Sequence, residues 1–435
     1  MARRFDAADP GFASAFGAFL DERRGAPADV DAAVAEIIAR VRDEGVVALL
    51  DYARRFDRVE LDEGDLRVTP DEIEAGAAAC PGEVREALAF AAARIRACHE
   101  RQRPTDARWT DEAGVELGWR WTALDSVGVY VPGGRAAYPS SVLMNVVPAV
   151  VAGVGRIAMV TPPGRLEPAV LAAAQIAGVS EIWRVGGAQA CAALAYGAGP
   201  IAPVDKIVGP GNAYVSAAKR RLYGVVGIDA LAGPSEILVV ADADNDPEWI
   251  AADLLSQAEH DPDAQSILIT DDAAFAARVE TAVETQLATL ATAEVAHTSW
   301  ERHGAIVVGP LADCPAWVDA IAPEHVEFAV ADPEALADRV RHAGAIFLGR
   351  WTPEAVGDYV AGSNHVLPTS RAARFSSGLS IYDFLKRTSI LRCSPEAFAR
   401  LGPPTATLAD AEGLPAHARS AALRLGQGAA TGRAG

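Results

Sequence analysis

The feature that most constrains the fold is an alternation of short apolar runs, glycine-rich turns and helical segments between residues 126 and 244. "SVGVYVPGG" (126–134) ends an apolar run in a Pro-Gly-Gly turn, and "AGVGRIAMVTPPG" (152–164) resembles the later "AGVSEIWRVGGAQ" (177–189). Each of these two units joins a helix end, a glycine turn, an apolar run and a glycine loop. Strands that alternate with helices at this spacing predict a parallel sheet covered by helices.

A second series of apolar strands is expected further along the chain, separated by helical patterns, at residues 266–272, 304–310, 325–330 and 345–351. We therefore predict an α/β fold class, with two Rossmann-like, incomplete parallel-sheet domains and helical extensions at the N- and C-terminus. The expected parts are an N-terminal helical extension (1–27), a discontinuous first α/β domain (28–125 and 238–375), a second α/β domain (126–237) and a C-terminal helical tail (376–435). The tail has little apolar core of its own, so we expect it to pack on a second subunit.

Composition narrows the class of function. The chain carries a formal net charge of -19 and no long run of Lys or Arg, so a nucleic-acid partner is not expected. Its five cysteines are scattered and form no C-x-x-C pair, which suits a reducing compartment. Asp6, Asp9 and Pro10 interrupt any apolar signal segment, and no apolar run approaches the ~18 residues that span a bilayer. We expect a soluble, cytoplasmic protein without a membrane partner.

Three glycine loops follow predicted strands, at residues 130–134, 185–190 and 208–215. Open α/β sheets bind ligands at the carboxyl ends of their strands, where helix N-termini offer unpaired N–H groups to phosphate. Each loop alone is more often a tight turn, but three in one sheet favour a nucleotide cofactor without naming it. A superficial G-x-G-x-x-A (153–158) is rejected, because it leads from a helix into a strand and a dinucleotide fingerprint does the reverse.

Polar residues with ligand chemistry are dispersed along the chain. A helix capped by Asp246 carries Gln257 and His260 three residues apart near its end, which predicts that both leave one face. Histidine is the commonest metal ligand, but this spacing alone favours an ordinary polar helix end. Further candidates stand beside glycine or proline in "GDYVAGSNHVLPT" and "AEGLPAHARS": Asp358, His365, Glu412 and His417. The remaining histidines lie in charged helical surroundings, where we expect them to be solvated: His99, His297, His303 and His342.

"APEHVEF" places Glu324 directly beside His325, after Pro323 and before a predicted strand. One interpretation is a solvated loop. The other is a reaction that needs two proton carriers at one place. Neighbours in a regular strand point to opposite faces, so the second interpretation requires irregular backbone at the beginning of this strand.

The strings "GVYVPGG", "GGAQA", "VGPGNAYV", "AGPSE", "SQAEHDPDAQS", "APEHVE", "GDYVAGSNHVLPT" and "AEGLPAHARSAALR" resemble, in order from about residue 25 to 426, the histidinol dehydrogenase family. The resemblance implies a zinc-dependent enzyme that uses NAD. It implies oxidation of L-histidinol through the aldehyde to L-histidine, the last step of histidine biosynthesis. It also implies a homodimer whose tails are exchanged between subunits.

The resemblance also implies roles for individual residues. The zinc ligands would be Gln257, His260, Asp358 and His417. The pair of bases would be Glu324 and His325. Substrate would be bound by Ser235, His365 and Glu412 together with His325 and the zinc ligands. NAD would be bound by Tyr130, Gln189 and Asn212, one from each glycine loop. Exchange of tails would place Glu412 and His417 in the site of the neighbouring subunit.

The implied reaction suits these groups. Alcohol oxidation needs a base near the hydroxyl proton, which suits the imidazole of His325, and hydration of the aldehyde needs a second base for water, which suits Glu324. The alternatives are a related zinc and NAD dehydrogenase for another small alcohol, a zinc hydrolase in which Glu324 activates water, and a two-domain binding protein without catalysis. Glu412 favours a substrate that bears an imidazole, and the three glycine loops have no use in a hydrolase.

Overall fold

The structure is a computed structural model that describes residues 2–22, 28–133, 138–164 and 166–426. The chain forms two compact units, Met1–Gln102 with Leu124–Phe384 and Arg103–Ala123 with Leu385–Gly435. Gly134 of the first predicted glycine loop and the outer parts of both predicted extensions (1, 23–27 and 427–435) lie outside the described residues.

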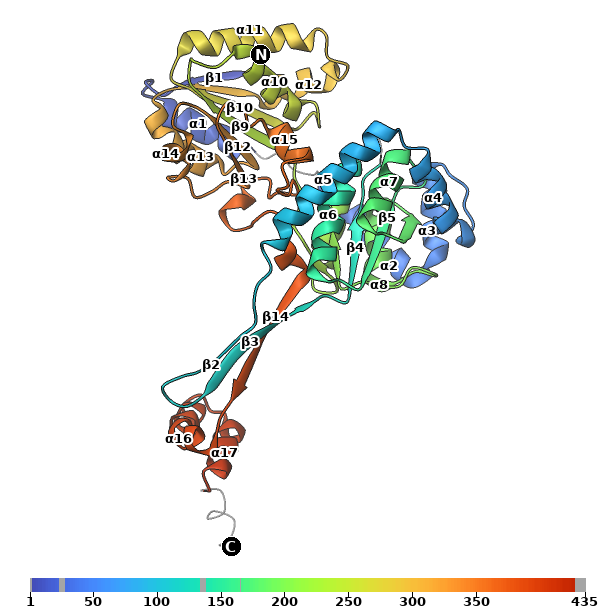
Figure 1. The fold of residues 1–435 in the computed structure, drawn as a ribbon, viewed down its shortest axis with the longest axis vertical. Coiled ribbons are helices and arrows are strands. Elements are labelled where there is room, and N and C mark those ends of the chain that lie inside the picture. Colours follow the sequence, from blue (N-terminus) through green and yellow to red (C-terminus); the bar gives the residue numbers. More distant parts are fainter. Residues whose placement is uncertain (1, 23–27, 134–137, 165, 427–435) are drawn as a thin grey trace. The chain divides into compact units, whose positions relative to one another are not determined.

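The first unit contains a six-stranded parallel sheet (Figure 1), in the order β1-β11-β10-β9-β12-β13. Its strands are β1 (Arg3–Asp6), β9 (Glu236–Ala241), β10 (Gln265–Thr270), β11 (Ala305–Val308), β12 (His325–Ala329) and β13 (Ala345–Leu348). The helices around it are α1 (Phe12–Asp21), α10 (Pro247–Ala258), α11 (Ala273–Leu287), α12 (Ala293–His303), α13 (Cys314–Ile321), α14 (Pro333–Ala337) and α15 (Glu354–Tyr359). Alternate residues of β9 enter two apolar clusters, one shared with α10 to α12 and one with α1 and α13. Because both faces are covered, the central strands are apolar runs.

The first unit also contains a five-stranded parallel sheet, in the order β6-β5-β4-β7-β8. Its strands are β4 (Ser126–Tyr130), β5 (Arg156–Thr161), β6 (Glu181–Arg184), β7 (Lys206–Val208) and β8 (Gly227–Ile228). Its connecting helices are α6 (Pro139–Ala152), α7 (Pro168–Ala177), α8 (Gly187–Tyr196) and α9 (Ala213–Leu222). The chain goes outward from β4 to β6 and then returns to place β7 on the other side of β4. The order of strands therefore reverses between β4 and β7.

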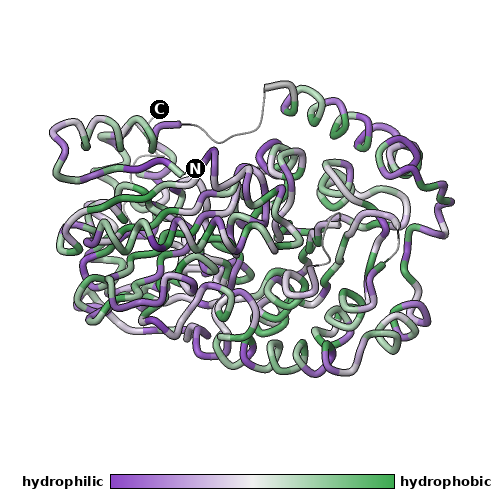
Figure 2. The backbone as a smooth tube through the Cα atoms, turned by 90° about the horizontal axis from the view of Figure 1, so that it is seen from above, coloured by the Kyte–Doolittle hydropathy of each residue, from purple (hydrophilic) through white to green (hydrophobic). Residues whose placement is uncertain are grey.

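Helices from the N-terminal part of the chain pack on the helices of the five-stranded sheet: α2 (Ala28–Glu44), α3 (Val46–Tyr52), α4 (Pro70–Ala78) and α5 (Gly82–Glu100). α2 contacts α8 and α9, whereas α4 and α5 contact α7 and α5 also contacts α6. Hydrophilic and hydrophobic residues alternate along the helical turns of the backbone (Figure 2), as expected for helices with one buried stripe.

The α/β class with two parallel sheets is confirmed, but the predicted domain division differs from this packing. Residues 3–6 are not part of a helical extension; they form β1, which pairs with β11 at the edge of the six-stranded sheet. Helices α2 to α5 pack on the helices of the five-stranded sheet, although residues 28–125 were predicted to form one domain with 238–375. An amphipathic pattern shows that a helix has a buried face but does not specify which sheet it covers, and four residues are too few for a clear strand period.

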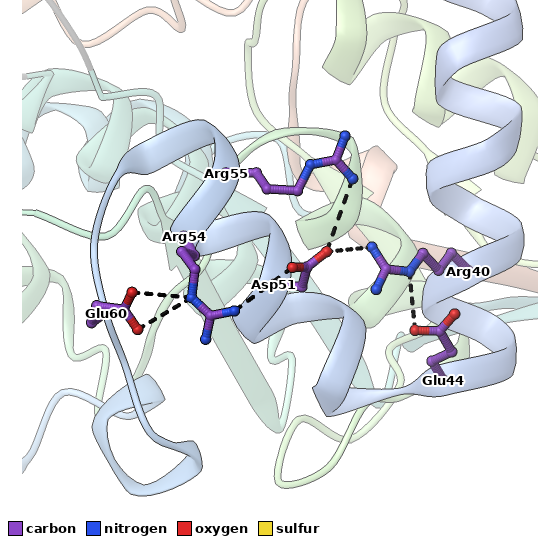
Figure 3. A network of polar contacts seen from close by, with 6 residues as sticks. All are labelled: Arg40, Glu44, Asp51, Arg54, Arg55 and Glu60. Atoms are coloured by element: carbon purple, nitrogen blue, oxygen red, sulfur yellow. Dashed lines mark hydrogen bonds and ion pairs between the residues drawn. The ribbon is translucent and has the colours of Figure 1, made fainter.

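A surface network of charges holds α2 and α3 together (Figure 3). Asp51 lies within ion-pair distance of Arg40, Arg54 and Arg55. These contacts join α2 to the end of α3 and to the π-helical turn Ala53–Asp57 that follows it. Such exposed pairs contribute little individually, so we assign the network to local order.

The second unit is an antiparallel sheet followed by two helices (Figure 1): β2 (Ala107–Thr110), β3 (Glu116–Ala123), β14 (Leu385–Arg392), α16 (Pro395–Ala411) and α17 (Pro415–Arg424). The predicted helical tail therefore also contains a 3-10 turn (Ile381–Phe384) and the strand β14, and its α-helices begin at Pro395. Its apolar side chains are incompletely packed within the unit, since Leu391 is 67% and Leu408 65% exposed.

Candidate active site

Glu324 and His325 lie at the beginning of β12, and both side chains reach one residue of the neighbouring strand. Ala322 adopts a left-handed conformation (φ 49°) after α13, so the chain turns sharply before the strand begins. Glu324 Oε2 accepts from the main-chain N–H of Glu236 at 2.9 Å, and His325 Nδ1 lies 3.0 Å from the Glu236 carbonyl oxygen. The two side chains converge on the first residue of β9, and both are buried. The interpretation of a solvated loop is wrong.

The hydrogen bond to Glu236 determines which nitrogen of His325 is available for chemistry. A carbonyl oxygen can only accept, so Nδ1 carries a hydrogen and donates it. Nε2 is buried, lies 3.5 Å from Oδ1 of Asp358 and makes no hydrogen bond to any residue that the structure describes. Nε2 is therefore the atom on which a neutral His325 can take a proton.

Carboxylates surround the imidazole of His325. Nδ1 lies 3.8 Å from Glu324 and 3.6 Å from Glu354, while Nε2 faces Asp358. Burial lowers the pKa of His325, but the charges of Glu354, Glu324 and Asp358 outweigh burial and hold that pKa well above its usual value. Burial raises the pKa of Glu324 to about 7, although His325 and the Glu236 N–H both lower it. Two proton-accepting groups of unlike chemistry thus lie side by side.

The Gln257 side chain, near the end of α10, is fixed between two groups of opposite hydrogen-bonding character. With its amide nitrogen toward Glu354, it donates to Oε2 at 3.0 Å, and its oxygen accepts from the Glu236 N–H at 3.1 Å. The reverse orientation would place oxygen against carboxylate oxygens and nitrogen against an N–H. Gln257 is 1% exposed, so water cannot satisfy a mismatched amide.

A group of donor atoms suited to a metal lies beside these residues. One ligand atom each from His325, Glu354 and Asp358 can be chosen so that all lie within 4.8 Å of one another. Asp358 Oδ1 and His325 Nε2 are buried without a hydrogen-bond partner among the described residues. Carboxylate oxygen is a ligand that zinc accepts, and an ion would satisfy the orphaned oxygen of Asp358, while Nε2 of His325 beside it stays available for a proton. Asp358 therefore fits a zinc ion.

Other predicted residues lie around Asp358. His365 is half-buried, and its Nδ1 lies 2.9 Å from the main-chain oxygen of Asp358. Burial raises the pKa of Asp358, but His325, His365 and His260 together hold it below its usual range, so all three histidines are electrostatic neighbours of this carboxylate. α10 ends at Ala258, so His260 lies in the turn beyond the helix, where it is exposed.

For the remaining predicted residues of this group, the structure gives the element in which each lies and its exposure. Ser235 is half-buried and immediately precedes β9. Glu412 and His417 belong to the second unit, Glu412 as the residue after α16 and His417 within α17, and both are exposed there. Their predicted role in the site of a neighbouring subunit stays a prediction.

The three residues predicted to bind NAD lie at the carboxyl edge of the five-stranded sheet. Tyr130 ends β4, and its hydroxyl accepts from the main-chain N–H of Gly187, where α8 begins. Gln189 is buried in the first turn of α8. Asn212 is the N-cap of α9, and its side-chain oxygen accepts from Tyr214 and Val215. The cap explains part of its placement without a ligand, a use that the sequence analysis did not predict.

Two of these loops meet where the order of strands reverses. A Cβ added at Gly209, which has φ 109°, would collide with the main-chain oxygen of Tyr130. Gly209 is held by a buried ion pair: its N–H donates to Asp229 at 2.8 Å, and its oxygen accepts from Lys219 at 3.0 Å. In an open α/β sheet, ligands usually bind between the two loops that flank such a reversal of strand order. The edge fits a dinucleotide.

Comparison with known proteins identifies the family. The sequence model described as histidinol dehydrogenase matches residues 21–425. The histidinol dehydrogenase of Caulobacter vibrioides is 76% identical over 426 residues, covering 98% of this chain and 100% of that protein. The corresponding protein of Rhodospirillum rubrum is 61% identical over 98% of this chain and 100% of its own length. The chain belongs to the histidinol dehydrogenase family. It is accordingly an oxidoreductase.

The fold agrees with a solved member of the histidinol dehydrogenase family. The crystal structure of histidinol dehydrogenase from Elizabethkingia anophelis superposes with a TM-score of 0.92 at 35% identity, and 98% of each chain is covered. No helix within the described residues has the length and apolar character to cross a membrane.

In this member of the histidinol dehydrogenase family, sequence reasoning missed two acidic residues and one histidine. Glu236 orients Glu324 and His325 through its backbone, which no side-chain pattern can indicate. Glu354 resembles an ordinary first-turn acid of a helix. His99, which was expected to be solvated, is 1% exposed and contacts Asn364, next to His365. Ile95 and Ala92, four and seven positions earlier in α5, were the available signal for its burial.

Proposed function

We propose that the chain is a zinc-dependent, NAD-linked histidinol dehydrogenase. It would oxidise L-histidinol by four electrons, through L-histidinaldehyde, to L-histidine in the last step of histidine biosynthesis. The observation that carries this proposal is the convergence of Glu324 and His325 on Glu236 in a member of this family, with Nε2 of His325 buried and unpaired among the described residues.

His325 serves as the general base for both hydride steps. Its Nδ1–H is held by the Glu236 carbonyl, so the tautomer is fixed and Nε2 faces the reacting group. In the first step Nε2 takes the hydroxyl proton of the alcohol, and in the second step it takes a proton from the hydrated aldehyde. To act twice, His325 must release its proton between the steps, which is easier when the charge of neighbouring Asp358 is neutralised.

Glu324 activates water for hydration of the aldehyde. A pKa of about 7 leaves a useful fraction of the carboxylate ionised at neutral pH and gives it enough basicity to take a proton from water. The hydrogen bond from the Glu236 N–H holds one of its oxygens, so the other oxygen is available to the water. The distance of 3.8 Å to His325 lets both bases serve one bound substrate.

Gln257, His260, Asp358 and His417 would hold the zinc ion. When bound, zinc supplies a Lewis-acidic centre for the amine and imidazole nitrogens of the substrate. Ser235, His365 and Glu412 would complete the substrate site, with Glu412 accepting the remaining imidazole N–H. Glu412 and His417 would come from the tail of the partner subunit in a homodimer. The apolar side chains that the tail leaves exposed support such an exchange.

Tyr130, Gln189 and Asn212 would bind NAD at the carboxyl edge of the five-stranded sheet. NAD supplies the acceptor for each hydride. The close approach of Gly209 to Tyr130 and the helix N-termini of α8 and α9 support this assignment, because the positive end of a helix dipole favours a phosphate. The expected cytoplasmic location stays a prediction.

The stoichiometry of NADH tests the complete reaction. Zinc-loaded protein is given a limiting amount of L-histidinol with excess NAD, and absorbance at 340 nm is followed to its end. Two NADH per histidinol are expected, with histidine as the product.

Each alternative gives a different result. One NADH with accumulating aldehyde would contradict the four-electron reaction. No NADH would favour a hydrolase or a binding protein. Oxidation of other small alcohols in preference to histidinol would favour a related dehydrogenase.

A further inference from the structure

Glu354 is a buried acid that the proposed chemistry leaves without a role. It is the first residue of α15 and is 2% exposed. Both carboxylate oxygens contact the amide nitrogen of Gln257, Oε2 at 3.0 Å, and Oε1 also lies 3.6 Å from Nδ1 of His325. A buried carboxylate is costly unless polar partners compensate it, so its presence between these two side chains calls for a reason.

The amide of Gln257 has two ends with opposite chemistry. Its oxygen can bind a cation or accept a hydrogen bond, whereas its nitrogen can only donate. The two orientations have nearly the same shape, so packing alone cannot select one. Selection requires an acceptor on one side and a donor on the other, and Glu354 and the Glu236 N–H are these two groups.

Glu354 itself is held in place by the strand that carries His325. Its main-chain N–H donates to the carboxylate of Glu327, which is 3% exposed on β12. Pro353, immediately before it, cannot donate a hydrogen bond and restricts the backbone. The carboxylate is therefore anchored independently of Gln257, as a group that orients another side chain must be.

We propose that Glu354 is a positioning residue that orients the Gln257 amide so that its oxygen can bind the metal through the lone pair that the Glu236 N–H leaves unused. This inference rests on the proposed function, because it requires Gln257 to be a zinc ligand. Partners of metal ligands typically account for 10- to 100-fold in metal affinity. Glu354 acts in this way on an amide, and the orientation of that amide decides whether its oxygen or its nitrogen faces the metal.

The test measures the affinity of the metal-free, full-length protein for Zn²⁺ by competition with a chromophoric chelator. Glu354→Met keeps the approximate size of the side chain but removes the acceptor, and we expect zinc to bind about 10- to 100-fold more weakly. Glu354→Gln keeps one acceptor oxygen, so a smaller loss is expected. Asp229→Asn is the matched control: it alters a carboxylate that is also buried but pairs with Lys219 and does not touch the amide, and we expect a change below about threefold.

A double-variant cycle separates orientation from charge. Gln257→Ala removes the amide, so Glu354→Met should add less than about a twofold loss in that background. A full additional loss there would show that Glu354 acts only through its charge and would overturn the inference. Thermal unfolding of the metal-free variants checks that each is folded, and a cobalt spectrum reports whether the ligand set changes.

The outcomes for the inference and for the proposed function differ. If Gln257→Ala weakens zinc binding but Glu354→Met does not, the positioning role is wrong and the ligand set stands. If Gln257→Ala keeps the zinc affinity of the unaltered protein, Gln257 is not a ligand, and the ligand set and the positioning role both fall.

Discussion

The two parallel sheets of the first unit carry their candidate site residues at opposite edges. The five-stranded sheet places Tyr130 at the end of β4 and Asn212 after β7, at the carboxyl edge where α/β proteins usually bind ligands. The six-stranded sheet places Glu236 and His325 as the first residues of β9 and β12, at the amino edge. Strands of similar sequence character therefore support two kinds of site.

The difference follows from what each edge offers. At a carboxyl edge, helices begin, so their unpaired N–H groups and positive ends suit an anionic cofactor. At the amino edge of β9, Glu236 offers an N–H and a carbonyl oxygen of a rigid strand, and these hold a carboxylate and an imidazole. The first edge favours binding of a charged ligand; the second fixes acid–base groups.

The largest effect that would test this comparison is expected for His325→Asn. Loss of the base should lower kcat for histidinol by about a thousandfold, since general-base catalysis contributes roughly 10²- to 10⁴-fold. The dissociation constant for NAD should change less than about twofold, because NAD is assigned to the other sheet. Steady-state kinetics and calorimetric binding of NAD measure the two quantities.

Glu324→Gln is the companion variant on the same edge. It should slow the oxidation of histidinol to the aldehyde less than His325→Asn does, while slowing the oxidation of added histidinaldehyde. Equal losses on both half-reactions would contradict the division of roles between Glu324 and His325. A large loss of NAD affinity in His325→Asn would contradict the separation of the two sheets.

A smaller effect, on the cofactor side, is expected for Gly209→Ala. The added methyl would collide with the Tyr130 carbonyl, so the loop must move, and KM for NAD should rise about tenfold with little change in kcat at saturating NAD. Gly224→Ala is the matched control, since Gly224 has a similar φ of 104° but open space around its Cβ position.

Gly224→Ala should therefore lower stability without raising KM for NAD. An equal rise in KM for both variants would mean that backbone strain, and not the contact with Tyr130, is responsible.

The sequence predicted the architecture where periodicity decides it. All four strands expected between residues 266 and 351 are present as β10 to β13, and the cap at Asp246 is as predicted. It did not predict β1, because these four residues can be recognised as a strand only from their pairing with β11. The sequence also did not predict which part of the molecule α2 to α5 pack against, because a buried apolar stripe on a helix does not identify the surface that covers it.

For the site, sequence motifs indicated which residues to consider, and the structure showed which of them are in contact. Gln257 and Asp358 stood out in the sequence, but the amide orientation that ties Gln257 to Glu354 depends on contacts across 97 positions of chain, from 257 to 354. Glu354 lacked a signal because an acid in the first turn of a helix is common for reasons of helix electrostatics. Contacts made by main-chain groups, such as those of Glu236, cannot be predicted from residue types, because every residue has these groups.

The smallest effect on activity is expected at the carboxyl edge of the six-stranded sheet, where Asp242 follows β9. Its carboxylate accepts from Arg350 at 2.6 and 2.7 Å and from the main-chain N–H of Ala331 at 2.9 Å, so it ties the ends of three neighbouring strands together. Asp242→Asn should lower the free energy of unfolding by about 1–3 kcal/mol, because it breaks a charge-assisted network.

In the same variant, kcat and both KM values should stay within about twofold, since this edge holds the fold and not the reaction. Asp271→Asn, at an exposed carboxylate after β10, controls for loss of one charge and should change the free energy of unfolding by less than ~0.5 kcal/mol. Denaturant unfolding and steady-state kinetics measure both variants. A tenfold loss of kcat in Asp242→Asn with stability retained would place chemistry at both edges of this sheet and remove the contrast with the five-stranded one.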